Sequence, residues 1–290
     1  MNTLWKEIRY KMLHSGSKIG LLIGINIIVY LAINIPGVID WMATGANHIS
    51  FYADEYLLLP ANFSKLATRF WTPLTYMFMH ASPLHIFFNM LWLYWIGQIF
   101  EEYLGNKRTV GLYLFGGLTG ALFFVLAFNY IPVFANSPLT AGAVVVDASA
   151  AVMAVVVATA TLLPDYTIYM MFIGPVKLKW IAIFYVILDF ILITGGNAGG
   201  EISHIGGALF GFIYIKQLQR GHDWIGGINS LFAPKANLKV VSKSSAKNSN
   251  DLPRQEEIDR ILDKISQSGY DSLNKQEKEV LFRASKSNEG

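Results

Sequence analysis

The 21 residues from Ile19 to Ile39 carry no charged side chain, and this stretch limits what the chain can fold into more than any other feature. As a helix it is long enough to cross about 30 Å of hydrocarbon. Basic residues precede it, as in a signal peptide, but the apolar run is too long for one and no small-residue cleavage site follows. The stretch therefore predicts a retained membrane-spanning helix.

The composition extends this prediction to most of the chain. Of 290 residues, 53% are hydrophobic and 15% are charged, whereas soluble domains are about 25% charged. Residues 216–290 hold 13 of the 23 Lys and Arg and 10 of the 20 Asp and Glu, so the first 215 residues are only about 9% charged. These numbers exclude a soluble enzyme and a disordered chain. They predict an all-α integral membrane protein with a solvated tail.

Six segments are predicted to cross the membrane as helices: 19–39, 84–100, 110–130, a fourth that ends at Leu163, 180–194 and 202–215. With both termini on one side, the other side receives only Lys65 and Arg69. The first side receives ten basic residues: Lys6, Arg9, Lys11, Lys18, Lys107, Arg108, Lys177, Lys179, Lys216 and Arg220. Because basic residues accumulate in cytoplasmic loops, we expect both termini to be cytoplasmic.

The polar ends of the chain complete the expected organisation: a cytoplasmic segment 1–18, a membrane domain 19–220, a linker 221–252 and a cytoplasmic helical hairpin 253–290. In the tail, apolar residues recur at helical spacing, and Asn274 with Glu277 has the spacing of a capping box. The apolar first outer loop, about 40–79, fits either a segment lying among lipid headgroups or a small folded loop. The sequence indicates no partner for the tail.

Polar side chains inside a membrane are expensive to place in lipid and mark function more often than in soluble cores. Within the six segments or leading into them, such side chains form four groups. These are His80, His85 and Asn89; Asp147 and Ser149; Asp189; and Ser203 and His204.

The sixth segment has one informative face. His204, Gly207 and Gly211 fall at i, i+3 and i+7, and glycines at this spacing allow a neighbouring backbone to approach closely. The fourth segment offers a matching surface of alanines around Ala150 and Ala154. If the two helices pack there, Ser149 and His204 can meet as a nucleophile and its base.

At this point three motifs resemble those of the rhomboid family of intramembrane serine proteases, over about 19–220. HASPLHIFFNM is similar to the family's His-x4-His-x3-Asn signature, DASA lies where the family has Gly-x-Ser, and HIGGALFG is similar to His-x-x-Gly-x-x-x-Gly. The topology and tail resemble the bacterial branch. The resemblance implies a six-helix bundle and an enzyme of the bacterial inner membrane that cleaves transmembrane protein substrates without a metal or cofactor.

The resemblance also assigns roles to the polar residues. Ser149 is expected to be the nucleophile and His204 the general base. Asn89 and His85, with the Ser149 amide, are expected to form the oxyanion hole, and His80 to line a water-filled outer cavity. The family's Ser-His dyad needs no third acid, and the resemblance gives Asp189 no role. We interpret Asp189 as forming a structural hydrogen bond to a neighbouring helix.

Two positions depart from the family pattern. Asp147 stands where the family usually has glycine two residues before the nucleophile, and Met153 stands where many members have tyrosine. Asp147 keeps a catalytically inactive rhomboid-like protein that binds membrane helices as an alternative. A small transporter using Asp189, Asp147 and the histidines as a proton relay has less support, because no pair of Gly- or Pro-broken helices occurs in corresponding halves. The absence of H-E-x-x-H disfavours a metalloprotease, and the +3 net charge, concentrated in the tail, disfavours nucleic acid.

Overall fold

The computed structural model describes residues 17–138, 140–170, 173–227 and 255–287. The chain divides into two compact units, one ending at Ala233 and the other starting at Pro234. Almost all of the predicted N-terminal segment 1–18 and most of the predicted linker 221–252 lie outside the described residues. The described start of that linker is packed against the first unit, since Ile225 is buried.

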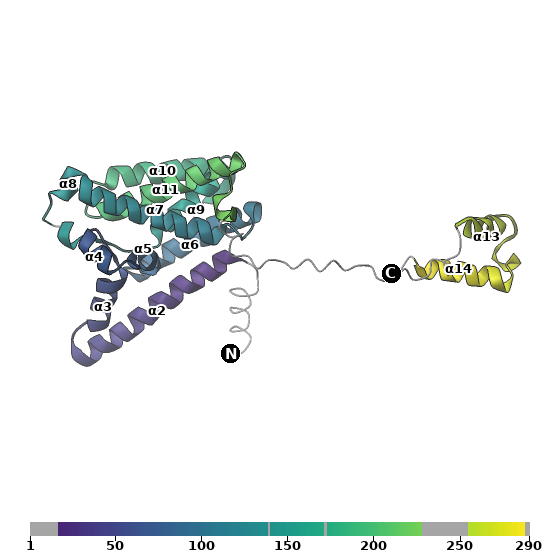
Figure 1. Cartoon of the computed structure of the whole chain (residues 1–290), viewed down its shortest axis with the longest axis horizontal. Coiled ribbons are helices and arrows are strands. Elements are labelled where there is room, and N and C mark those ends of the chain that lie inside the picture. The colour runs from purple at the N-terminus through teal and green to yellow at the C-terminus, as the bar shows by residue number, and fades with distance from the viewer. Residues whose placement is uncertain (1–16, 139, 171–172, 228–254, 288–290) are drawn as a thin grey trace. The chain divides into compact units, whose positions relative to one another are not determined.

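Each of the six segments predicted to be a membrane helix is helical. The long helices of the first unit are α2 (Lys18–Thr44), α6 (Pro83–Leu104), α7 (Thr109–Tyr130), α9 (Ser149–Leu162), α10 (Leu178–Leu192) and α11 (Ala198–Gln219) (Figure 1). By length and composition α2 and α7 are able to cross a membrane, and α9 is a shorter apolar helix. The number of crossings stays a prediction.

The sixth of these helices differs most clearly from its expected bounds. The apolar pattern marked 202–215, whereas α11 begins at Ala198 and ends at Gln219. The hydropathy pattern did not include the first turn of α11, because that turn contains the polar residue Glu201. The Glu201 side chain is nevertheless buried. This polar turn therefore faces the interior of the bundle and not lipid or water.

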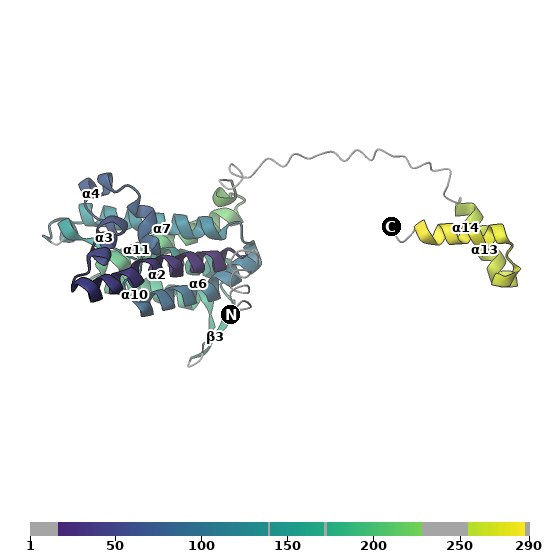
Figure 2. The ribbon, with the colours of Figure 1, turned by 90° about the horizontal axis from the view of Figure 1, so that it is seen from below.

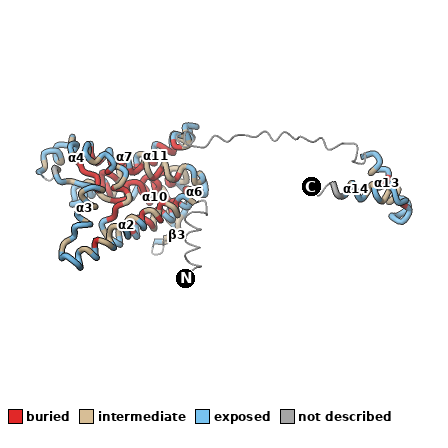
Figure 3. Tube along the Cα trace, turned by 60° about the horizontal axis from the view of Figure 1, so that its bottom comes forward, coloured by how far each residue is buried: buried red, intermediate tan, exposed pale blue. Residues whose placement is uncertain are grey.

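The centre of the bundle is α9. Every residue from Ala150 to Ala160 is buried, and the helix contacts α6, α7, α10 and α11. Figure 3 shows buried segments of the first unit, in red, in the middle of the helices, with exposed segments around them. The exposed side chains of the outer helices include large apolar ones, such as Phe87 of α6 and Phe184 and Phe190 of α10. An exterior of this kind suits hydrocarbon and not water.

The segment predicted to be the first outer loop is folded. It contains α3 (His48–Leu57), β1 (Leu59–Pro60), α4 (Phe63–Thr68), α5 (Thr72–Thr75) and η1 (Tyr76–Phe78). Between α7 and α9 lie α8 (Pro132–Ala135), η2 (Thr140–Gly142) and β2 (Val144–Val145). Strand β1 pairs antiparallel with β2, with Leu59 opposite Val145. This pairing thus fixes the segment that leads directly to Asp147 and Ser149. Elsewhere in the loop, Phe70 is 77% exposed.

The remaining elements are a hairpin and α2 in the first unit and the short helices of the second unit. Strands β3 (Thr167–Met170) and β4 (Gly174–Lys177) form a hairpin between α9 and α10, and α2 runs alongside α6 (Figure 2). The second unit contains α13 (Gln255–Ser268), η3 (Tyr270–Ser272) and α14 (Lys275–Ser287). The reciprocal hydrogen bonds of a capping box are present at the start of α14. The Glu277 amide donates to Asn274 Oδ1 (2.9 Å), and the Asn274 amide donates to Glu277 Oε2 (2.8 Å).

Candidate active site

Ser149 and His204 lie in contact, although 55 positions separate them in the sequence. Ser149 is the first residue of α9 and His204 lies in the second turn of α11. The distance from Ser149 Oγ to His204 Nε2 is 2.5 Å. A hydroxyl hydrogen-bonded to an imidazole is the arrangement in which the ring can take the hydroxyl proton and the oxygen can attack a carbonyl carbon.

Close packing of α9 on α11 brings the two side chains together. A Cβ on Gly207 would collide with the carbonyl oxygen of Ala150, and a Cβ on Gly211 would collide with that of Ala154. The two helices therefore approach backbone to backbone along a stripe that continues directly from His204. A larger residue at either glycine would separate the helices and lengthen the contact between His204 and Ser149.

The second ring nitrogen of His204 faces a carboxylate. Asp189 of α10 places Oδ1 3.0 Å from His204 Nδ1, and Glu201, one turn earlier in α11, places Oε2 3.6 Å from the same atom. An ionised carboxylate only accepts hydrogen bonds, so Nδ1 is the donor and Nε2 is left to accept from Ser149. Ser149, His204 and Asp189 thus have the connectivity of a serine-hydrolase triad.

Asp189 was expected to form a hydrogen bond to a neighbouring helix, and its partner on that helix is His204. Glu201 was not predicted to belong to the site, although the i, i+3 spacing of Glu201 and His204 places both on one helical face. Asp189 and His204 are 15 positions apart on different helices. No local spacing could therefore have identified their contact.

The donors expected to form the oxyanion hole already surround an anion. Asp147 Oδ1 accepts from the Ser149 amide and from Asn89 Nδ2, at 2.9 Å in each case. Its second oxygen forms an ion pair with His85 Nε2. Asp147 is 3% exposed. Its carboxylate therefore occupies the position that these three donors would offer to a developing oxyanion.

The backbone at Asp147 is also unusual. Its φ of 125° is the one positive value among the described non-glycine residues, in a region that glycine adopts without steric cost. The Asp147 amide donates to the Tyr76 carbonyl at 3.0 Å. The preceding segment and η1 thus hold this residue in place, with its side chain turned inward and not toward solvent.

His80 lies behind these donors. Its side chain is fully buried, 3.9 Å from Asp147 Oδ1, and its ring makes edge contacts with Tyr30 and His85. Neither ring nitrogen has a hydrogen-bond partner among the described residues. Its expected place beside a water-filled cavity stays a prediction, as do the catalytic roles of the other residues.

Three side chains of the site have ligand atoms close enough to share a cation. These atoms of Asp189, Glu201 and His204 all lie within 4.8 Å of one another. Metal binding through His204 Nδ1 would replace its hydrogen bond to Asp189, so the ion and the triad exclude each other.

Comparison with known proteins gives three findings. The family described as Rhomboid domain matches residues 67–220. A family of unknown function, DUF6576, matches residues 247–287. RHOMBOID-like protein 12, mitochondrial, from Arabidopsis thaliana is 31% identical over 180 residues, which cover 59% of this chain. The match spans about half (52%) of that relative's own length.

Proposed function

Because the chain belongs to the rhomboid family, we propose that it is an intramembrane serine endopeptidase that cleaves membrane-protein substrates. Membership makes it a membrane protein, and the family acts on transmembrane substrates within the bilayer. The observation that carries the proposal is the 2.5 Å contact between Ser149 Oγ and His204 Nε2. The relative is a plant protein with a mitochondrial name, so it does not support assignment of this chain to the bacterial branch. That assignment stays a prediction.

The proposed reaction begins at this contact. His204 Nε2 takes the hydroxyl proton as Ser149 Oγ attacks the carbonyl carbon, and Asp189 holds the ring and stabilises the imidazolium that forms. His204 then gives the proton to the leaving nitrogen, and water hydrolyses the acyl-enzyme by the same steps. Asp189 is a positioning residue, because it acts through His204. Glu201, 3.6 Å from the same nitrogen, supports it.

The oxyanion is proposed to bind the Ser149 amide, Asn89 and His85, at the positive end of α9. Loss of one such donor typically lowers the rate by about 10²–10³. The Asp147 carboxylate is bound to all three of these groups in the structure. A substrate carbonyl must therefore displace its carboxylate before the reaction can proceed, so Asp147 restrains the enzyme.

The same observation favours a second function, a rhomboid-like protein that binds membrane helices without cleaving them. In that case the Asp147 carboxylate would never leave the three donors. The two functions differ in one measurable respect: the restrained enzyme cleaves substrate with Asp147 in place, and the inactive relative does not.

Cleavage of a single-span model substrate in proteoliposomes tests the proposal. We expect the native chain to produce two fragments, and Ser149→Ala and His204→Ala to lower the rate at least about 10⁴-fold. Ser203→Ala is the matched control, since the Ser203 hydroxyl donates to the Gly199 carbonyl of its own helix. Unaltered cleavage by Ser149→Ala would refute the assignment. No cleavage by the native chain would favour the inactive relative.

The six crossings and the cytoplasmic termini belong to the same proposal, supported by the ten basic residues on one side. The chain has no cysteine, so single cysteines report topology without background. Ser64→Cys and Ser268→Cys both place the thiol at an exposed position. We expect an impermeant maleimide to label the first and not the second in intact cells; the reverse pattern would overturn the orientation.

A further inference from the structure

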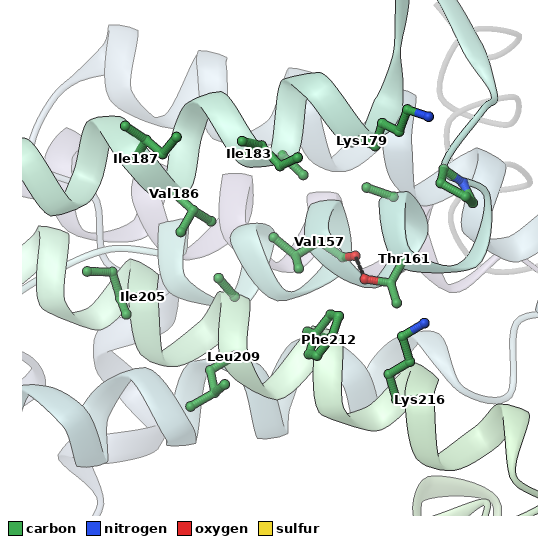
Figure 4. Close-up of a pocket in the computed structure, with 14 residues that line it drawn as sticks. Val157, Thr161, Lys179, Ile183, Val186, Ile187, Ile205, Leu209, Phe212 and Lys216 are labelled. Atoms are coloured by element: carbon green, nitrogen blue, oxygen red, sulfur yellow. Dashed lines mark hydrogen bonds between the residues drawn. The ribbon is translucent and has the colours of Figure 1, made fainter.

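A groove with a volume of about 540 Å³ runs between α10 and α11, with α9 as its floor (Figure 4). Its walls are apolar along most of its length, with Ile183 and Val186 from α10, Leu209 and Phe212 from α11, and Val157 from α9. Two ammonium groups lie at one end, those of Lys179 and Lys216. The groove therefore offers an apolar slot that ends in positive charge.

The charged end lies opposite the candidate active site. Lys179 is in the first turn of α10 and Lys216 in the last turn of α11. Ser149 begins α9, and Thr161, which lines the groove, is 12 residues further on, about 18 Å along the helix axis. The lysines therefore contribute nothing to the Ser149–His204 chemistry, and the groove is a separate feature of the bundle.

The positive charge at this end is only partly neutralised. Asp165 Oδ1 accepts from Lys179 (2.8 Å) and from Lys177 (2.9 Å), so one carboxylate serves two ammonium groups. Lys179 and Lys177 lower the pKa of Asp165 to about 2, which keeps it ionised at neutral pH. Lys216 Nζ lies 5.7 Å from the centre of the Phe212 ring, and no ion pair of Lys216 occurs within the described residues.

The groove is long and apolar. Its lining residues on α11 span Ile205 to Lys216, about 16 Å along the helix axis. Aliphatic and aromatic side chains form most of its walls, and the two lysines lie at one end. An extended acyl chain with an anionic headgroup matches this length, this apolar lining and this charge.

We propose that the groove binds an anionic phospholipid of the surrounding bilayer, with one acyl chain between α10 and α11 and its phosphate between Lys179 and Lys216. An apolar slot open to lipid fills with hydrocarbon at no cost in desolvation. Basic pockets between membrane helices attract anionic headgroups, and each lysine near the membrane surface contributes about 1 kcal/mol to that attraction.

Native mass spectrometry of the full chain in detergent tests this proposal, with phosphatidylglycerol and phosphatidylcholine of identical acyl chains as probes. We expect tighter binding of phosphatidylglycerol. Lys179→Gln and Lys216→Gln should each weaken it about fivefold. Lys177→Gln is the matched control, because Lys177 also pairs with Asp165 but does not line the groove.

A second pair of variants tests the acyl chain. Ile183 lines the groove and Ile191 does not, and both are exposed isoleucines of α10. Ile183→Trp should abolish the tight binding of phosphatidylglycerol, whereas Ile191→Trp should leave it unchanged. Equal binding of the two lipids, equal loss in Lys177→Gln, or unchanged binding in Ile183→Trp would each overturn the proposal. None of these readouts depends on proteolysis.

Discussion

Asp147 stands where rhomboid proteases usually carry glycine, and its carboxylate accepts hydrogen bonds at the position proposed for the oxyanion. If this carboxylate competes with substrate, Asp147→Gly frees three donors and also relieves the positive φ of 125°. Since one donor is worth about 10²–10³ in rate, we expect kcat for cleavage to rise at least about tenfold. Initial rates in proteoliposomes measure this effect.

In that experiment, Asp147→Asn distinguishes the effect of the negative charge of Asp147 from the effect of the space that its side chain fills. The amide fills the same space without the negative charge, so its rate should lie between those of the native chain and Asp147→Gly. A rate for Asp147→Gly at or below the native one would show that the aspartate supports the site and does not restrain it.

Asp189 gives the second prediction at this scale. Asp189→Asn replaces the charged acceptor that fixes the Nδ1 proton of His204 with a neutral amide that can also donate, and comparable changes in soluble triads lower kcat about 10⁴-fold. Here Glu201 can partly replace it, so we expect a loss on the order of 10² in kcat with KM unchanged. Glu201→Gln is the comparison and should lose less. A similar loss in both variants would argue against a special role for Asp189.

Among the elements, the contact of α9 with α11 determines the geometry of the site. Gly207→Ala places a methyl group against the Ala150 carbonyl, and overpacking of this kind typically costs about 1–3 kcal/mol. We expect a lower thermal unfolding midpoint in detergent and slower cleavage. Gly196→Ala is the matched control, since a Cβ there meets no atom within 4 Å. Equal midpoints for the two variants would contradict the close packing.

The elements also show how much of the fold could be predicted from the sequence. Long apolar runs predicted six helices, because burying backbone polar groups in lipid requires helices. The stripe of His204, Gly207 and Gly211 could be identified because it lies within one helix. Contacts between helices depend on how each helix is rotated about its axis, which hydropathy does not encode. The contact of Asp189 with His204 and that of Asp147 with Asn89 therefore emerged only from the structure.

In the whole molecule, a membrane unit is joined to a second unit with its own polar stabilisation. Lys264 Nζ donates to both Glu277 oxygens, at 2.9 and 3.0 Å, and this contact lowers the pKa of Glu277. A carboxyl whose pKa is lowered on folding stabilises the fold above its unfolded pKa, about 4.3. That stabilisation is lost as the pH falls through the lower folded value.

Hydrogen exchange of the α14 amides in the full chain, corrected for intrinsic rates, measures this effect. Protection should be constant from pH 7 to about pH 5 and fall in more acidic solution. Glu277→Gln should remove much of this dependence, whereas Glu279→Gln should retain it. Identical pH profiles for the native chain and Glu277→Gln would contradict the account.

The most direct test of the whole molecule is the reactivity of Ser149 in the folded, membrane-reconstituted chain. A fluorophosphonate probe modifies a serine hydroxyl that a neighbouring base activates, and peptide mass spectrometry identifies the modified residue. We predict labelling of Ser149 in the native chain, faster labelling in Asp147→Gly and no labelling in His204→Ala. An unlabelled Ser149 in the native chain, or equal labelling in His204→Ala, would contradict a serine protease built on this pair.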